Sequence, residues 1–482
     1  MRSDPHLLVK RTAHPELIFL FAVALLVGGC TLFSGDENAT DTTTTTTAPD
    51  PEDSPAETLP QTDPGPVPEP GPGELFELLG PEDRIVVQTA EQNLSILTFA
   101  GEVLAATTND AAQPVFSPDG RRLAWTTFNP ASTSGAIVFG SVAEDGSVTI
   151  DAEVPAPVVS YYSVWAPDGS GRLAILGNAP GGTGLAVVDE GGSTPVVEAD
   201  IPYYFSWRPE ADGVVAHAGN RLRSFDLLTG VGTDVQFVAP TFRAPALLAD
   251  GSAVFVVANN VDPAGGDGAV LRLDAELDGA FNPDLARRIV DFNGRATLVL
   301  SPDGKKLSIL VEGSGVVAQV NNTAGGGGHF QDRGTLGRGL HILNLETEEI
   351  STLRTEAIRA AFWAPNSEMI ASVNFDSLGD GRAYSSWTVS SSDGEEISRT
   401  PRFVLSTQFE GAYLPFYDQY AQALTIWSPD SSRLVFPGSS VGRDEGIWLH
   451  RLPDGRSEAA TFKIAEGSVA FWSPVRERRD DD

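Results

Sequence analysis

The sequence predicts an all-β fold: a single β-propeller of eight four-stranded blades, with seven blades as the alternative, preceded by a disordered stalk. Three observations predict it. A turn motif followed by an apolar run recurs along the chain. The 49 glycines and 34 prolines among 482 residues favour turns over long helices. The strands that follow the stalk and the last strand of the chain complete one another as a single blade.

The N-terminus has the pattern of a secretory signal. The basic residues Arg2, Lys10 and Arg11 precede eleven uninterrupted apolar residues, 17–27. As a helix this apolar stretch would span about 16 Å, against a hydrocarbon core of about 30 Å. We therefore expect export of the chain, and we expect the stretch not to remain as a membrane span.

The segment Val27-Gly28-Gly29-Cys30 directly follows the apolar stretch and contains the one cysteine of the chain. It resembles the lipobox of bacterial lipoproteins. This resemblance implies that Cys30 receives a diacylglycerol and becomes the mature N-terminus, so that the protein is anchored on the extracytoplasmic face of a bacterial membrane. Ordinary secretion with an incidental cysteine is the alternative.

Residues 31–73 have a different composition from the rest of the chain. They contain nine prolines and nine acidic residues, no lysine or arginine, and the run Thr42–Thr47. A stretch with so little apolar content cannot bury enough surface to offset the entropy of ordering. We predict a disordered, partly extended tether.

The repeat consists of an aromatic or leucine residue, a Ser-Pro-Asp-Gly-like turn and a second apolar run. Its copies begin at Phe116, Trp165, Trp207, Leu247, Leu300, Trp363, Trp427 and Trp472. Five of the eight tryptophans thus share one position, and we expect them to pack between neighbouring blades. Proline, aspartate and glycine favour a tight turn between two strands. The copy at Leu247 is degenerate, which keeps seven blades open as an alternative.

The two ends of the repeat region are expected to form one blade together. Residues 84–88, 94–99 and 103–107 supply its second to fourth strands, and residues 469–472 supply its first. Pairing the termini in this way would leave no open sheet edge in the ring. The predicted domains are therefore a signal peptide (1–29), a lipidated cysteine with its linker (30–76), the propeller (77–476) and a charged tail (477–482).

The motif Trp-Ser/Ala-Pro-Asp-Gly followed by an apolar run resembles the TolB-like, WD-repeat-like propeller repeats of bacterial envelope proteins. The resemblance covers residues 84–475. It implies a propeller fold and contacts within the cell envelope. It does not imply one function, because such repeats have many roles.

The long connections are expected on one face of the propeller, where the first strand of each blade begins; they are residues 259–268, 313–338, 375–382 and 400–423. We expect partner binding there. Aromatic and arginine side chains are common interface anchors. The candidates are Tyr161, Tyr162, Tyr203, Tyr204, Arg243, Arg359, His329, Arg333, Tyr413, Phe416, Tyr417 and Tyr420. Packing between blades is an equally weighted alternative for the paired tyrosines.

Composition excludes some classes of function. A formal net charge of −33 argues against nucleic acid as a partner. No catalytic residues are assigned, because the histidines lack ligand spacing and the expected funnel positions carry few acidic or histidine side chains. We therefore expect a monomeric binding or scaffold module for an envelope protein or glycan, without a cofactor. The alternatives are Ca²⁺ in the aspartate-containing loops, and a glycan or lactone hydrolase or lyase with its site in the central funnel.

Overall fold

The computed structural model describes residues 79–80, 83–106, 111–129, 134–179, 182–200, 203–218, 221–227, 231–237, 243–259, 267–276, 281–313, 335–377, 383–440 and 445–474. The chain divides into two compact units, Met1–Gly65 and Pro66–Asp482, and the described residues all belong to the second unit. The predicted signal peptide, linker and charged tail lie outside the described residues.

Five of the sheets contain four antiparallel strands each, and four of these begin in the first half of the chain. The first consists of β1 (Ile85–Gln88), β2 (Leu94–Thr98), β3 (Gly101–Ala106) and β33 (Val469–Trp472). The second consists of β4 (Ala111–Phe116), β5 (Arg122–Asn129), β6 (Ser134–Val142) and β7 (Val148–Ala156). The third consists of β8 (Val159–Trp165), β9 (Leu173–Ala179), β10 (Gly182–Asp189) and β11 (Gly192–Asp200). The fourth consists of β12 (Tyr203–Trp207), β13 (Gly213–Ala218), β14 (Arg221–Asp226) and β15 (Gly232–Phe237).

The second half of the chain departs in part from the four-stranded pattern. The fifth sheet contains β16 (Ala246–Leu247), β17 (Ala253–Asn259), β18 (Gly268–Asp274), β19 (Arg287–Phe292) and β22 (Thr335–Leu336), with the turn η3 (Pro283–Leu285) before β19. The sixth contains β20 (Arg295–Leu300), β21 (Lys306–Glu312), β23 (Gly339–Asn344) and β24 (Ile350–Arg354). The last is an eight-stranded sheet of β25 (Ile358–Trp363), β26 (Met369–Ser377), β27 (Ala383–Ser391), β28 (Glu396–Arg399), β29 (Phe403–Leu405), β30 (Arg433–Ser440), β31 (Glu445–Arg451) and β32 (Ala460–Ala465).

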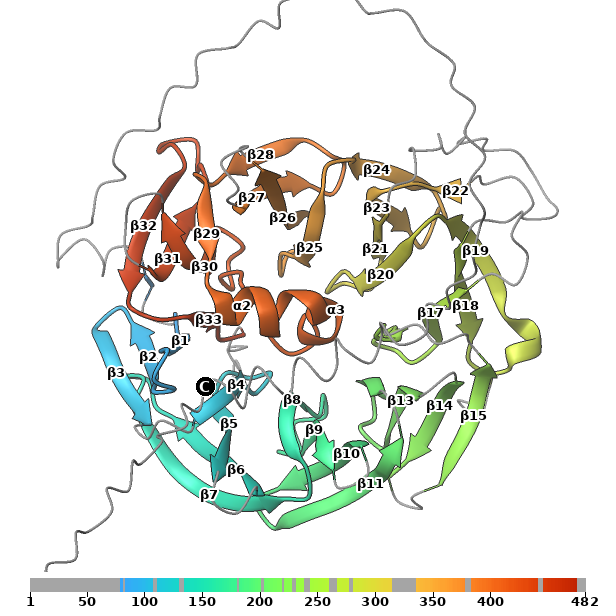
Figure 1. Cartoon of the computed structure of the whole chain (residues 1–482), viewed down its shortest axis with the longest axis horizontal. Helices are drawn as coiled ribbons and strands as arrows, with labels where there is room; N and C mark the ends of the chain where they lie inside the picture. Colours follow the sequence, from blue (N-terminus) through green and yellow to red (C-terminus); the bar gives the residue numbers. More distant parts are fainter. Residues whose placement is uncertain are drawn as a thin grey trace, which may run out of the picture. The chain divides into compact units, whose positions relative to one another are not determined.

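The sheets of the second unit stand side by side around a common centre, which is the arrangement of a β-propeller (Figure 1). The all-β prediction is confirmed for the described residues. Helices α2 (Thr407–Ala412) and α3 (Tyr417–Tyr420), joined by η4 (Leu414–Phe416), lie in that centre (Figure 1). None of the helices in the described part of the chain has the length and apolar character that a membrane crossing requires.

The repeated turn has the geometry that its residue types dictate. The Ser117 hydroxyl donates to Asp119 Oδ1 at 2.6 Å and accepts from the Arg122 backbone N–H at 3.0 Å. Gly120 has a φ of 65°, which glycine adopts without strain. The turns at Ser301 and Ser428 repeat these hydrogen bonds. The prediction that the repeated aspartates are turn residues is confirmed.

The repeated tryptophans join neighbouring sheets. Trp165 Nε1 donates to the Val115 carbonyl at 3.1 Å, and Trp427 Nε1 donates to the Phe362 carbonyl at 2.9 Å. Trp207 and Trp363 make the same bond to the sheet before theirs. In each case the acceptor directly precedes the equivalent position of the earlier repeat, and for Trp427 this repeat belongs to the same eight-stranded sheet. Burial of the ring and one hydrogen bond per interface explain why tryptophan recurs there. The predicted packing between sheets is confirmed.

The terminal strands meet as the sequence predicts. Strand β33 pairs antiparallel with β1, with Ile85 opposite Trp472 and Gln88 opposite Val469. Beside this pair, Arg433 Nη1 lies 2.8 Å from Asp83 Oδ2, and the Arg433 guanidinium lies 5.2 Å from the centroid of the Trp472 ring. The N-terminal strands, the C-terminal strand and the turn before β30 therefore contact one another.

The segment after β28 differs from the predicted long loop. Strand β29 pairs with both β27 and β30, and it thereby joins strands that would otherwise form two sheets. The chain then enters α2, whose first turn is capped by Ser406. We call residues 406–423 the central insertion. These short helices have no apolar repeat of their own, and contacts with the surrounding sheets hold them in place.

Candidate functional site

The central insertion and the strand starts around it bring most of the predicted site residues together. Of the candidates, the structure places these in one cluster: Tyr161, Tyr162, Tyr204, Arg243, Tyr413, Phe416, Tyr417 and Tyr420. They come from the third, fourth and fifth sheets and from the insertion itself. The contacts seen for this cluster are therefore contacts of the chain with its own insertion, and a role in partner binding stays a prediction.

Most aromatic rings of the cluster are buried, with Tyr161 and Phe416 partly exposed, and the rings pack edge to face or tilted. The Tyr162 ring centroid lies 5.3 Å from that of Tyr420 and 5.6 Å from that of Phe205. The Tyr413 centroid lies 4.7 Å from that of Tyr420 and 5.2 Å from that of Phe471. Large aromatic rings supply much of the buried apolar area that holds a short helix in place. The insertion is thus packed as part of the core and is not a surface loop.

The polar residues of the insertion bind the inner edges of the surrounding strands. Strand β12 ends its sheet, so its inner edge has no neighbouring strand. Gln419 Oε1 accepts from the Phe205 backbone N–H at 2.8 Å, and Gln419 Nε2 donates to the Phe205 carbonyl at 2.9 Å. The Gln422 side chain also contacts the Phe205 carbonyl and the Ser206 hydroxyl. One side-chain amide therefore satisfies both main-chain groups of Phe205, a residue buried in the centre.

Three further residues make contacts of the same kind. Asp418 Oδ2 accepts from the Ala244 backbone N–H at 2.8 Å. The Tyr420 hydroxyl donates to the Tyr161 carbonyl at 2.6 Å. The Ser406 hydroxyl donates to the Ser468 carbonyl at 2.5 Å while it caps α2. The insertion is therefore anchored to the first, third, fourth and fifth sheets at once.

The electrostatics of the cluster keep its hydroxyl groups protonated. Burial raises the pKa of Tyr161 to about 12, partly opposed by its hydrogen bond to Thr183. Burial also raises the pKa of Tyr204, Tyr417 and Tyr420 well above the ordinary value, and the nearby Asp418 carboxylate adds to the effect at Tyr204 and Tyr417. At neutral pH these tyrosines act as hydrogen-bond donors and apolar surfaces, and not as bases.

Asp418 is the most unusual charged group of the centre. Its side chain is 2% exposed, and its Oδ1 has no hydrogen-bond partner in the described part of the chain. Burial raises the pKa of its carboxyl group, and the Arg243 charge and the Ala244 N–H oppose that rise. Arg243 itself donates from Nε to the Ala296 carbonyl at 3.0 Å and lies 3.6 Å from Glu312. The arginine is therefore engaged elsewhere and does not pair closely with Asp418.

The positions expected to line the central funnel are all buried. Their exposed fractions range from 0 to 8% at Gln113, Tyr162, Tyr204, Ala244, Thr297, Ala360, Leu424 and Val469. The central insertion contacts several of them, including Tyr162, Tyr204 and Ala244.

The remaining candidates lie apart from the cluster or outside the described residues. Arg359 is exposed near the start of β25, with its guanidinium 5.0 Å from the centroid of the Phe375 ring. Tyr203 begins β12, but its side chain is outside the described set. Cys30, His329 and Arg333 also lie outside the described residues.

Two of the loop aspartates considered for Ca²⁺ lie in the described ranges: Asp376 falls in β26 with its side chain outside the described set, and the side chain of Asp267 is described. Asp267 Oδ2 accepts from the Gly294 backbone N–H at 2.6 Å, so this oxygen holds a turn. Within the described ranges, no group of three or more His, Cys, Asp or Glu side chains is arranged to hold a metal ion.

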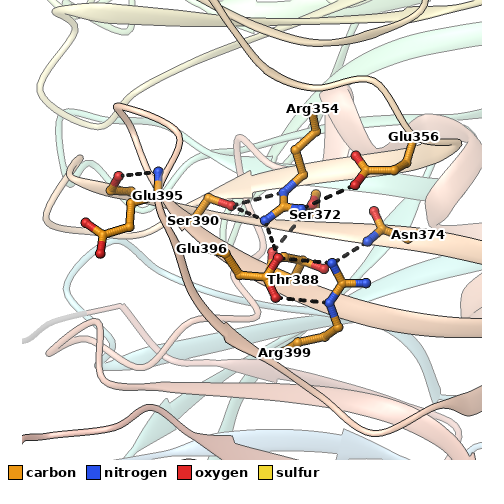
Figure 2. A network of polar contacts seen from close by, with 10 residues as sticks. Arg354, Glu356, Ser372, Asn374, Thr388, Ser390, Glu395, Glu396 and Arg399 are labelled. Carbon is orange, nitrogen blue, oxygen red and sulfur yellow. Dashed lines mark hydrogen bonds and ion pairs between the residues drawn. The ribbon is translucent and has the colours of Figure 1, made fainter. Parts of the chain in front are cut away.

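A second polar cluster, which the sequence did not indicate, joins the sixth and seventh sheets (Figure 2). Arg354 Nη2 lies 2.8 Å from Glu396 Oε2 and 3.0 Å from the Ser390 hydroxyl, and Arg399 pairs with the same carboxylate. Hydrogen bonds from the two arginines, working against desolvation, lower the pKa of Glu396 to about 2. Each charge in this network is matched by an opposite charge, so we interpret the network as a structural link between sheets.

Comparisons with known proteins give distant structural matches alone. No family model matches the sequence, and no curated protein matches it. Solved structures give distant matches to β-propeller proteins. TolB from Acinetobacter baumannii is 10% identical with a TM-score of 0.33, and the match covers 73% of this chain and 83% of that one. An oligogalacturonate lyase in complex with manganese is 14% identical with a TM-score of 0.41, over 75% and 86% of the two chains. The β-propeller domain of the trilobed protease from Pyrococcus furiosus is 12% identical with a TM-score of 0.43, over 75% and 97%.

Proposed function

We propose that this protein is a membrane-anchored, extracytoplasmic propeller lipoprotein that binds an envelope protein or glycan through the face on which its long connections lie. The observation that carries the binding role is the filled centre. The strand starts, where a propeller enzyme would place its reacting groups, are buried against the central insertion. We therefore propose that the partner binds at the rim of this face, outside the central insertion.

The rim offers charged side chains that a partner can reach. Arg295, at the start of β20, has a side chain that is 80% exposed. Arg359, near the start of β25 in the next sheet, is also exposed. Arginine at the edge of a binding surface favours partners with carboxylate, phosphate or hydroxyl groups. We therefore propose that the partner contacts these two strand starts.

We further propose that the ring contains eight blades and is closed by its two termini. The eight-stranded sheet supports this count, because two of its segments, 363–369 and 427–434, each contain one repeat turn. Strand β29 joins the two halves. The pairing of β1 with β33 supports the closure. A closed ring leaves no strand edge open between the first and last blades.

The anchor is proposed from Cys30, and its test is direct. The variant Cys30→Ala cannot be acylated, so it should leave the membrane fraction and appear in the soluble or secreted fraction. Mass spectrometry of the wild-type N-terminal peptide should show the lipid mass on Cys30. A variant that remained with the membranes would contradict the anchor.

Partner binding is tested with a photo-crosslinking amino acid at two positions in intact cells. One position is Arg359, at the proposed rim. The matched control is Lys305, exposed in the turn after β20, at the opposite end of the first strands. We expect a discrete crosslinked species from position 359 and none from position 305. Adducts from position 305 alone would contradict the choice of face, and their absence from both positions would contradict the binding role.

A further inference from the structure

The central insertion is held in the ring by contacts that include one buried carboxyl group, Asp418. We propose that this group makes the docking of the insertion dependent on pH: the neutral carboxyl holds residues 406–423 in the centre of the ring, and the ionised carboxylate loosens them. This inference concerns the protein's own conformation and does not rest on the proposed binding role.

The two carboxyl oxygens of Asp418 have different surroundings. Oδ2 accepts a hydrogen bond from the Ala244 N–H at 2.8 Å, which suits either protonation state. Oδ1 is buried and has no hydrogen-bond partner among the described residues. An ionised carboxylate would leave charge on this unpartnered oxygen away from water, which is costly. A protonated carboxyl group avoids that cost.

Burial outweighs the Arg243 charge and the main-chain N–H groups of Ala244, Asp418 and Gln419, so the side chains that face Asp418 offset this charge only in part. They are Tyr162 from β8, Tyr204 from β12, Tyr417 on the same helix and Arg243 before β16, with Glu312 and His217 beyond Arg243. The tyrosines stay neutral because burial raises their pKa values. Burial lowers the pKa of His217, so it is neutral at and above its ordinary titration range. Arg243 is cationic but lies against Glu312 and the Ala296 carbonyl.

The sign of the pH dependence follows from the raised pKa of Asp418 in the docked state. A released insertion would expose the carboxyl group to water, where its pKa returns to the ordinary value of 3.8. The docked state therefore holds its proton to higher pH than the released state. Docking is strongest below the ordinary pKa and weakens as the pH rises through the raised one.

Tyrosine absorbance can measure the docking of the insertion in the unmodified protein. Six of the eight tyrosines of the chain contact the insertion or belong to it: Tyr161, Tyr162, Tyr204, Tyr413, Tyr417 and Tyr420. Second-derivative ultraviolet spectra separate tyrosine from tryptophan. Between pH 4.5 and 8.5, we expect the tyrosine bands of the full chain to shift towards exposed tyrosine while the tryptophan bands stay unchanged. A flat tyrosine signal over this range would overturn the proposal.

Hydrogen exchange of the peptide that covers residues 406–423 gives the second measurement. The wild-type protein and Asp418→Asn are compared at the same pH, so that the intrinsic exchange rates cancel. The asparagine can still accept from the Ala244 N–H but cannot ionise. We expect the protection of the wild type, relative to the variant, to fall on the order of tenfold from pH 4.5 to pH 8.5.

The matched control is Glu410→Gln, which removes an exposed carboxylate from the same insertion. It should keep the pH dependence of the wild type. The same pH dependence in Asp418→Asn as in the wild type would assign the effect to another group and would overturn the proposal. If Asp418→Asn does not fold, the wild-type tyrosine spectra with the Glu410→Gln control still decide the question.

Discussion

Gln419 is the residue whose replacement tests most directly how the insertion is held. Its side chain is 1% exposed, and it bonds both main-chain groups of Phe205, which is itself fully buried. In Gln419→Leu the Phe205 N–H would have no acceptor, because leucine offers neither an acceptor nor a donor. The Phe205 carbonyl would keep its longer bond, 3.3 Å, from Gln422 Nε2.

The expected loss in docking depends on what happens to the N–H and to the carbonyl of Phe205. An orphaned buried N–H costs about 1–3 kcal/mol, whereas the carbonyl retains one partner. We therefore expect a net loss of about 2 kcal/mol in the docking of the insertion, which corresponds to a decrease of about 30-fold in its equilibrium constant. The double variant Gln419→Leu/Gln422→Leu should lose more than the sum of the single variants, because the carbonyl then loses its remaining side-chain partner.

The assay is native-state hydrogen exchange, read at the insertion and at the Phe205 amide. Local opening is the right quantity here, because global unfolding of a chain of this size need not be two-state. Glu410→Gln is the control for a substitution at an exposed position of the same insertion. A change in protection of less than threefold in Gln419→Leu would refute the reasoning that side-chain amides cap the inner strand edges.

Three further predictions concern the contacts between sheets. Asp83→Ala removes one partner of the nearly buried Arg433, which keeps Asp430 at 3.1 Å, so the free energy of unfolding should fall by about 2 kcal/mol in denaturant titrations, with exchange fastest at β1 and β33. Equal loss in all sheets would contradict the local role. Trp427→Phe deletes a hydrogen bond that Trp472→Phe does not, because Trp472 Nε1 has no such partner in the described residues. Trp427→Phe should therefore be less stable than Trp472→Phe by about 1 kcal/mol in the same titrations, and equal stability would argue against the indole hydrogen bond. Glu396 has a lowered pKa, so its stabilising effect is present above about pH 4.5 and is lost as the pH falls towards 2. Glu396→Gln should make the free energy of unfolding less dependent on pH in that window and should cost less than about 1 kcal/mol at pH 7. An unchanged dependence on pH would exclude this carboxylate as a contributor.

The parts of the fold that the sequence predicted are those with local and repeated causes. The turn at Ser117 needs only the five residues that follow it, and the same bonds recur at Ser301 and Ser428. A tryptophan at one position of each repeat implies one site per interface, and four described indoles occupy it. The pairing of β1 with β33 followed from counting strands at the two ends. Because their causes are local or repeated, these features could be predicted without three-dimensional information.

The central insertion was not predicted as helix, and the reason is physical. Helices of six and four residues contain too few turns to show a 3.6-residue apolar period. Their stability comes from contacts with sheets more than 150 residues earlier in the chain, such as the bond between Gln419 and Phe205. One signal was available. Residues 407–423 include only two charged side chains, Glu410 and Asp418, and an exposed loop in a chain that is 20% charged should carry more.

Many of the predicted site residues lie together, but their contacts are with the central insertion, and partner binding stays a prediction. The tyrosines at the starts of β8 and β12 do lie beside the aromatic residues of the 400–423 connection, as expected for residues on one face. What the sequence could not show was whether they face a partner or each other. Whether these tyrosines face a partner or each other depends on whether the connection folds back into the ring. Strands of two or three residues, such as β22 and β29, were missed for a related reason, since so short a stretch has no alternation to detect.

The residue types of the insertion match the main-chain groups that they meet. Phe205 presents both an N–H and a carbonyl to the centre, and it meets glutamine, whose amide oxygen accepts and whose amide nitrogen donates. Ala244 presents an N–H and meets a carboxyl group, whereas the Tyr161 carbonyl meets a hydroxyl donor. The inner edges of a propeller ring therefore act as a template of donors and acceptors. A segment that carries the complementary side chains in the right order can fill the centre of the ring without adding a strand to any sheet.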